Sequence, residues 1–234
     1  MTTDELSLND PEALRQLLAN TEALLLDFEG PVCSVFAGIP ACRVADRLRE
    51  VLADGGRADL PPDVERSEDP FDVFRYAAKL GEFEASLIEA SLQAHEVEAV
   101  RTAKPTSSAH RLIESWHSTG RKSAIVSNNS EKAVRSYLKL HGLTTSVDYV
   151  SARTTPNPAI LKPASYLVLQ AVELIGAPSS KCTLVGDAAT DIIAAHAAGV
   201  RAVGFANKQY KKDTLTQEGA DIIVTDIGRL VENI

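Results

Sequence analysis

The 234-residue sequence is poor in cysteine, in aromatic residues and in positive charge. Its three cysteines, Cys33, Cys42 and Cys182, form neither a Cys-x-x-Cys pair nor an even set, which disfavours a disulfide scaffold or a structural zinc site. Asp and Glu outnumber Lys and Arg by 32 to 24, and the formal charge of −8 argues against nucleic acid or an anionic membrane as partner. A small anionic substrate is still compatible with this charge if a metal ion or a particular lysine supplies local positive charge.

The sequence also lacks an apolar run long enough to cross a bilayer. Residues 1–10 are acidic and polar, whereas a secretory signal would be basic and then apolar. The hydrophobic fraction of 44% and the charged fraction of 24% are ordinary for a globular protein. We therefore expect a cytoplasmic protein, either a monomer or a homodimer.

Short apolar runs alternate with helical patterns along most of the chain. Residues 23–28 form an unbroken apolar run that Gly30-Pro31 closes, as expected for a buried parallel strand. Further strands are predicted at residues 123–126, 147–150, 182–185, 202–205 and 222–224, and helices at residues 10–20, 108–119, 131–140 and 163–175. This alternation predicts an α/β fold with a Rossmann-like, mostly parallel sheet and helices on both faces.

Residues 35–104 break this alternation because they show only helical spacing. We predict an inserted all-helical cap domain at 35–104 and an α/β core domain formed by 1–34 and 105–234. The phenylalanines Phe71, Phe74 and Phe83 are interpreted as packing within the cap. Arg153, shortly after a predicted strand, has two possible orientations, toward a site or toward solvent.

Polar residues follow several predicted strands, and ligands of parallel α/β sheets gather at those carboxyl ends. The candidate site residues are Asp27, Glu29, Ser127, Asn128, Lys162, Asp187 and Asp191. Several carboxylates at one point need a cation among them, and hard oxygen ligands suit Mg²⁺. Lys162, expected to open the helix at Pro163, and the hydroxyl of Ser127 would bind a phosphate group. The set therefore indicates phosphate chemistry.

The motifs that are missing narrow this chemistry. There is no Gly-x-x-x-x-Gly-Lys-Ser/Thr loop, no Gly-x-Gly-x-x-Gly turn, no His-Glu-x-x-His pair and no Gly-x-Ser-x-Gly elbow. A carboxylate beside Mg²⁺ can itself attack phosphorus and form an aspartyl-phosphate that water then hydrolyses. Asp27 is the expected nucleophile.

Four segments, in order, resemble the four motifs of the haloacid dehalogenase superfamily. They are Leu24-Leu25-Leu26-Asp27-Phe28-Glu29, Ile125-Val126-Ser127-Asn128, Leu161-Lys162-Pro163 and Val185-Gly186-Asp187-Ala188-Ala189-Thr190-Asp191. The helical insert after the first motif is similar to the type 1 cap of subfamily I of that superfamily.

The resemblance implies a role for each candidate residue. Asp27 would be nucleophile and metal ligand. Residue 29 would bind Mg²⁺ through its carbonyl group and act as acid and base. Ser127 and Lys162 would hold the phosphoryl oxygens, with Asn128 as a further substrate or phosphate contact. Asp187 and Asp191 would complete the metal site.

Glu29 departs from the resemblance, because phosphatases of this superfamily carry a second Asp there. The extra methylene of Glu moves the carboxyl by more than ~1 Å, which can cost on the order of 100-fold in rate. We expect a Mg²⁺-dependent phosphatase for a small phosphorylated metabolite. The alternatives are a phosphomutase and a catalytically damped protein that binds phosphorylated ligands.

Overall fold

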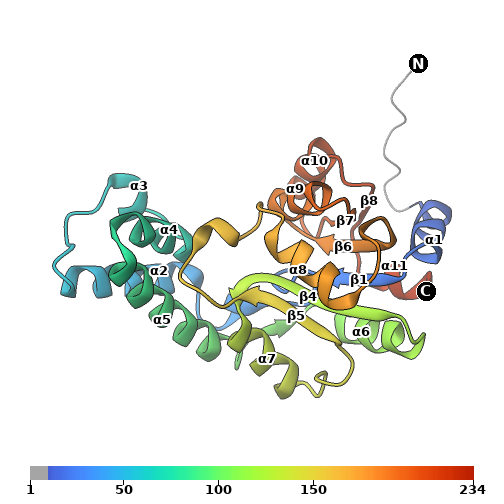
Figure 1. Cartoon of the computed structure of the whole chain (residues 1–234), viewed down its shortest axis with the longest axis horizontal. Coiled ribbons are helices and arrows are strands. Elements are labelled where there is room, and N and C mark those ends of the chain that lie inside the picture. The colour runs from blue at the N-terminus through green and yellow to red at the C-terminus, as the bar shows by residue number, and fades with distance from the viewer. Residues whose placement is uncertain (1–9) are drawn as a thin grey trace.

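Strand β1 (Ala23–Leu26) lies at the centre of a six-stranded sheet in the computed structural model, which describes residues 10–234 (Figure 1). The strand order is β5-β4-β1-β6-β7-β8, and every pairing is parallel. The other strands are β4 (Lys122–Ser130), β5 (Tyr149–Arg153), β6 (Cys182–Gly186), β7 (Arg201–Phe205) and β8 (Ile222–Val224). The predicted Rossmann-like α/β fold is confirmed. The polar segment that argued against a secretory signal falls outside the described residues, except for Asp10.

Helices cover both faces of the sheet because β1 alternates its apolar side chains between two cores. Leu24 and Leu26 pack on one face and Leu25 packs on the other. The first core includes α1 (Pro11–Ala19), α6 (Ala109–Ser118), α7 (Glu131–Leu140) and α11 (Gly228–Glu232). The second includes α8 (Tyr166–Ile175), α9 (Ala189–Ala197) and α10 (Gln209–Gln217). Among the described helices, none has both the length and the apolar character to cross a membrane.

Residues 35–104, called the cap below, form a helical projection at one end of the molecule (Figure 1). Its elements are η1 (Val35–Ala37), α2 (Ala41–Asp54), α3 (Pro62–Glu65), α4 (Pro70–Leu80) and α5 (Glu82–Ala99). The chain enters and leaves the cap through an antiparallel ribbon of β2 (Cys33–Ser34) and β3 (Lys104–Pro105). The ribbon places the two crossings side by side, which brings the cap over the carboxyl end of β1.

Two local predictions are wrong. The predicted packing of Phe83 in the cap fails, because this side chain is 75% exposed, whereas Phe74 is fully buried. The helix predicted to begin at Pro163 begins instead at Tyr166. The short helix η2 (Pro158–Ile160) precedes it and the short helix η3 (Ser179–Lys181) follows it. The reason for the later start is that the backbone N–H and C=O of Lys162 are both bonded to the side chain of Asn128, at 2.8 and 3.2 Å, which holds this segment against β4.

Candidate active site

The candidate residues meet where β1, β4 and β6 end. β1 lies between the other two strands, so residues that follow them in the chain become neighbours in space. Asp27 comes directly after β1 and Asp187 directly after β6, and the Asp27 backbone N–H donates to the Val185 carbonyl at 2.9 Å. Ser127 lies within β4, which continues to Ser130 through a shift in its pairing with β5.

A buried ammonium group lies between two of the carboxylates. Lys162 Nζ is 2.7 Å from Asp27 Oδ1, 2.6 Å from Asp191 Oδ1 and 3.1 Å from the Val126 carbonyl oxygen. Burial by itself would lower the pKa of Lys162, but the charges of Asp191 and Asp27 outweigh burial and raise that pKa. Lys162 is therefore a fixed positive charge at this point.

Asp191 also organises the start of α9. Its Oδ2 accepts hydrogen bonds from the backbone N–H groups of Asp187 and Ala188, each at 3.0 Å. One oxygen each of Asp27, Asp187 and Asp191 lie within 4.8 Å of one another. Burial raises the pKa of Asp27, and the neighbouring Asp191 raises it further; burial likewise raises the pKa of Asp187. Three buried carboxylates that repel one another are a donor set that fits a hard divalent cation.

Two glycines make room for these carboxylates. Gly30 has a φ of +101°, and a Cβ at this position would collide with the carboxylate of Asp187. A Cβ at Gly186 would collide with the side chain of Asp191. Glycine is therefore required at both positions for the acidic groups to approach one another.

Glu29 lies at the side of the site that adjoins the cap. Its Oε2 accepts a hydrogen bond of 2.8 Å from the backbone N–H of Val35, the first residue of the cap. Burial raises the pKa of Glu29 to about 7, although the hydrogen bond from Val35 opposes this shift. A carboxyl group with this pKa can hold or release a proton near neutral pH.

Asn128 contacts the main chain of Lys162 with both ends of its side-chain amide, as described above. Ser127 Oγ donates to Asn129 Oδ1 at 3.2 Å and accepts from the Asn129 backbone N–H at 3.1 Å. In this structure Asn128 thus holds Lys162 in place, while its side chain also borders the cavity described next.

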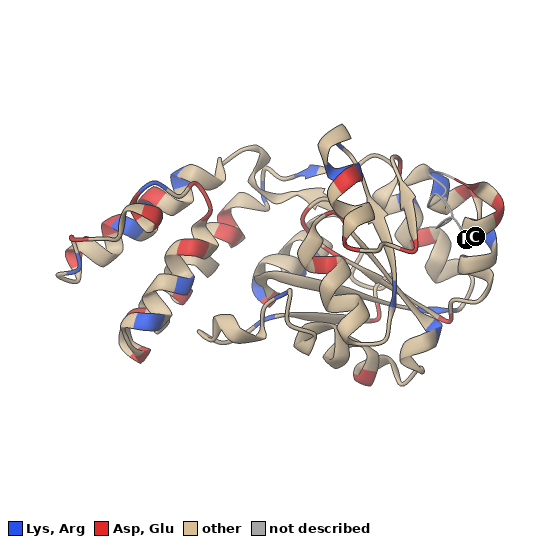
Figure 2. Cartoon of the chain, turned by 90° about the horizontal axis from the view of Figure 1, so that it is seen from above, with Lys and Arg blue, Asp and Glu red and all other residues tan. Residues whose placement is uncertain are grey.

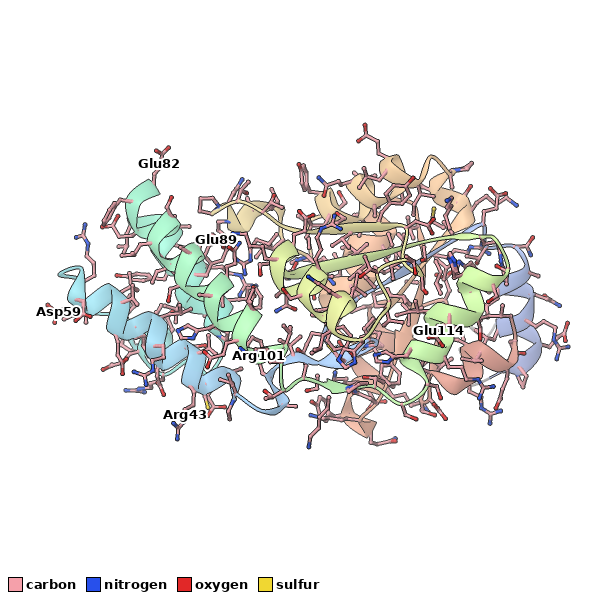
Figure 3. The ribbon with its side chains drawn as sticks, turned by 90° about the horizontal axis from the view of Figure 1, so that it is seen from below. Arg43, Asp59, Glu82, Glu89, Arg101 and Glu114 are labelled. Atoms are coloured by element: carbon pink, nitrogen blue, oxygen red, sulfur yellow. The ribbon has the colours of Figure 1, made fainter. Side chains whose placement is uncertain are left out.

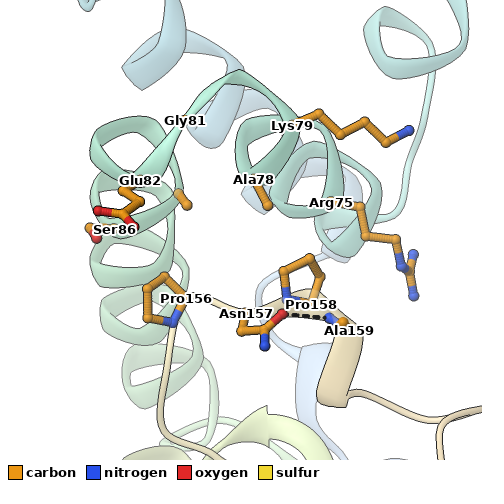
Figure 4. A pocket seen from close by; sticks show the side chains of 11 residues that line it. Arg75, Ala78, Lys79, Gly81, Glu82, Ser86, Pro156, Asn157, Pro158 and Ala159 are labelled. Atoms are coloured by element: carbon orange, nitrogen blue, oxygen red, sulfur yellow. Dashed lines mark hydrogen bonds between the residues drawn. The ribbon is translucent and has the colours of Figure 1, made fainter.

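All seven candidate residues line a cavity of about 600 Å³ between the core and the cap. The cap contributes Phe36, Ala41, Glu68, Asp69, Pro70 and Phe71 to its wall. A second cavity, of about 860 Å³, lies between the α4–α5 turn and residues 156–159, and none of the seven borders it (Figure 4). The candidate site residues are therefore associated with the first cavity and not with the second.

Sequence reasoning missed Lys211, on α10, whose ammonium contacts the carboxylate of Asp187. No motif marks this lysine, because it follows the last recognisable segment by some 20 residues.

The sequence is compatible with Arg153 facing a site or the solvent, and the structure shows a third arrangement, in which Arg153 is buried between the core and the cap. Its Nη2 lies 2.7 Å from Glu96 Oε2, its Nη1 contacts Glu89, and its Nε donates to the Asn128 carbonyl at 3.0 Å. Both glutamates belong to α5, and Glu89 lies on the side of that helix nearer the core (Figure 3).

A comparison with known protein families shows to which family this chain is related. Residues 68–205, more than half of the chain, match the haloacid dehalogenase-like hydrolase family. The chain belongs to this family. A solved structure of a hydrolase from Pseudomonas syringae shares the fold of this haloacid dehalogenase-like hydrolase, with a TM-score of 0.66 and 18% identity over 90% of this chain and 96% of the other.

Two curated relatives are each 30% identical to this haloacid dehalogenase-like hydrolase. One is "Protein SUPPRESSOR OF QUENCHING 1, chloroplastic" of Arabidopsis thaliana, matched over 59% of this chain and 13% of its own length. The other is named "Putative pyrophosphatase PpaX", of Caldanaerobacter subterraneus subsp. tengcongensis, matched over 49% of this chain and 51% of its own length. The chain thus spans about an eighth of the first relative and about half of the second.

Proposed function

We propose that this hydrolase is a Mg²⁺-dependent phosphatase that acts on a small phosphorylated metabolite through an aspartyl-phosphate. The observation that carries the proposal is the group of Asp27, Asp187 and Asp191 around the buried Lys162, open to a cavity large enough for a small metabolite. The family of the chain and the name of the PpaX relative support the same reaction class.

In this proposal Asp27 is the nucleophile. Its Oδ1 accepts hydrogen bonds from Lys162 and from the Phe28 backbone N–H, both at 2.7 Å, which leaves Oδ2 for attack on phosphorus. An O–P bond forms to Asp27 while the bond from phosphorus to the ester oxygen breaks. Lys162 and Ser127 hold the phosphoryl oxygens, and Asn128 keeps Lys162 in position.

Glu29 moves the protons. Protonated Glu29 gives its proton to the leaving ester oxygen, and the resulting carboxylate then takes a proton from the attacking water. The water oxygen displaces Asp27 from phosphorus, which releases inorganic phosphate and restores both carboxyl groups. Mg²⁺, held by Asp27, Asp187, Asp191 and the backbone carbonyl of Glu29, would offset the negative charge of the phosphoryl group.

The test is turnover of p-nitrophenyl phosphate with Mg²⁺, with EDTA, and with Asp27→Asn. We expect metal-dependent release of nitrophenol that the substitution abolishes. No turnover of this ester or of a broad panel of phosphorylated metabolites would contradict the proposal and favour a protein that only binds such ligands. Turnover that survives Asp27→Asn would contradict the role of Asp27.

The role of Glu29 has its own test, the Glu29→Asp variant. A rise in turnover would mean that the longer side chain slows proton transfer. A fall would mean that the pocket is shaped for Glu. An unchanged rate would show that residue 29 is not the proton donor.

A further inference from the structure

The cavity has two ends that differ in charge. Its inner end holds the fixed ammonium of Lys162 and the proposed metal ligands. Its cap end is formed by Phe36, Ala41, Pro70 and Phe71 together with the acidic residues Glu68 and Asp69. No Lys, Arg or His from the described part of the cap lines this end.

Two arginines of the cap near this end are engaged by other groups. Arg49, on α2, donates to the Ser67 carbonyl at 2.8 Å and lies 2.5 Å from Asp46 Oδ1. Arg75, on α4, has Nη1 2.9 Å from Asp72 and 3.9 Å from Asp69. It borders the second cavity, together with Lys79 and Glu82 (Figure 4). Both partners of its longer contact are half-exposed, so water and salt weaken this contact.

Arg153 of the core does not reach the cavity surface. Arg153 has no exposed surface and lies behind the rings of Phe71 and Phe74, with its guanidinium carbon 5.8 and 5.3 Å from their centroids. Its charge is opposed by Glu89 and Glu96. Arg153 therefore cannot reach a ligand in the cavity.

Glu68, in contrast, is exposed, and none of the described cationic side chains lies within ion-pair distance of it. The cap as a whole carries both charges along its helices (Figure 2), so the acidic character is particular to this end of the cavity. A substrate with its phosphate at Lys162 and its organic part toward the cap would meet Glu68, Asp69 and the two phenylalanines.

We propose, resting on the phosphatase function above, that the site prefers phosphate monoesters whose organic part carries an ammonium group. Opposite charges attract across the cap end, and an ammonium group also binds favourably to aromatic faces. An organic part with a carboxylate or a second phosphate meets two acidic residues, and no Lys, Arg or His of the described cap lines this end to attract it. Glu68 and Asp69 are therefore specificity-determining residues.

Three substrates of equal length test the proposal: phosphoethanolamine, 2-hydroxyethyl phosphate and phosphoglycolate. After the ester oxygen and one methylene they end in CH2–NH3⁺, CH2–OH and COO⁻, respectively, so their chains are equally long but differ in terminal charge. With Mg²⁺ at low ionic strength we expect kcat/KM to fall in that order, by about tenfold or more between the first and the third. Equal values, or preference for phosphoglycolate, would overturn the proposal.

Substitutions then assign the preference to the two residues. In the double variant Glu68→Gln, Asp69→Asn, the ratio of kcat/KM for phosphoethanolamine to that for phosphoglycolate should approach one, mainly through KM. Asn at 69 can still accept the hydrogen bond from the Phe71 backbone N–H that begins α4, so the fold is preserved. Glu65→Gln, an exposed change of the same charge outside the cavity, is the matched control and should leave the ratio unchanged. A ratio that the double variant does not move would also overturn the proposal.

Turnover of p-nitrophenyl phosphate separates the two proposals. If this ester, whose aryl part is uncharged, is hydrolysed but phosphoglycolate is preferred to phosphoethanolamine, only the inference about the cap end fails. If no phosphate ester is hydrolysed, the phosphatase function itself fails and the inference falls with it.

Discussion

Two buried ion clusters in this protein have the same composition, one cation between two carboxylates. Lys162 lies between Asp27 and Asp191, and Arg153 lies between Glu89 and Glu96. The first cluster opens onto a cavity and has a third carboxylate, Asp187, beside it. The second is closed between α5 and the core. Burial of charge is thus common to both, and only access and the additional acidic group distinguish a site for chemistry from a structural contact.

Asn128 connects the two clusters. Its backbone carbonyl accepts the hydrogen bond from Arg153, and its side chain holds the backbone of Lys162. Glu96, in turn, accepts hydrogen bonds from the Ser130 backbone N–H at 2.8 Å and from Asn129 Nδ2 at 3.2 Å. Helix α5 of the cap is therefore joined to the same segment of β4 that positions the lysine.

Removal of the cation from the open cluster should have the largest effect. Lys162→Met should lower kcat for p-nitrophenyl phosphate on the order of 10³-fold, because the phosphoryl oxygens lose a preorganised positive charge. Without metal, the variant should also unfold at a lower urea concentration than the wild type. Mg²⁺ should restore part of the lost stability, because it would offset the repulsion between the carboxylates. A variant that retains more than a tenth of the activity would contradict the assigned role.

The same substitution in the closed cluster should act on stability. Arg153→Met leaves Glu89 and Glu96 buried without their cation, which should lower the free energy of unfolding by about 3–5 kcal/mol in urea titrations. Mg²⁺ should not restore the lost stability of this variant. Adding Glu89→Gln and Glu96→Gln should recover much of the loss, because the unpaired charges are then gone; no recovery would contradict an electrostatic origin.

The connection between the clusters predicts a smaller effect. Asn128→Ala should lower kcat about 10- to 100-fold, because displacement of Lys162 by about 1 Å is enough for such a loss. The free energy of unfolding should fall by only about 1–2 kcal/mol. A change in KM alone, with kcat retained, would indicate a direct contact with substrate.

Glu29 borders the open cluster, but among the described residues no Lys or Arg lies within ion-pair distance of it. We therefore expect its ionisation to destabilise the folded protein, unlike that of the paired carboxylates. Its pKa is raised from 4.5 to about 7, chiefly by burial. Below pH 4.5 Glu29 is protonated in both folded and unfolded protein, so it imposes no cost. Between pH 4.5 and 7 the unfolded chain loses the proton first, so stability falls as pH rises, and it levels off above 7.

Glu29→Gln should remove this loss. In urea titrations without metal, wild type and variant should be equally stable at about pH 3.5, below both pKa values of Glu29. At pH 8 the variant should be more stable, by an amount on the order of 2 kcal/mol. A difference that is the same at both pH values would contradict the raised pKa.

The smallest effect is expected for Lys211, whose ammonium contacts Asp187 at the partly exposed edge of the open cluster. Lys211→Gln should raise the affinity for Mg²⁺ about threefold in calorimetric titrations, because a competing cation is removed from one ligand. Lys212→Gln, the same change on the neighbouring residue, serves as the control. Weaker Mg²⁺ binding in the Lys211 variant would show that this lysine supports the metal site.

Local patterns were sufficient for much of this architecture. The apolar run before Asp27, the glycines at 30 and 186 and the Asp187–Asp191 segment were recognisable because each lies within a few residues and carries its own turn or helix start. The assignment of Phe83 to the cap interior failed because helical spacing does not say which face of α5 finds a neighbour.

The chain order of apolar runs, their periods and the acidic residues that follow them were enough to determine an α/β sheet with a helical insert and a set of carboxylates at strand ends. The contacts of Arg153, Lys211 and the Lys162 backbone depended on the tertiary structure, because their partners are 24 to 64 positions away and no local propensity links them. Whether a buried charge meets a cavity or a second element is set by packing in three dimensions, and that packing separated the two clusters.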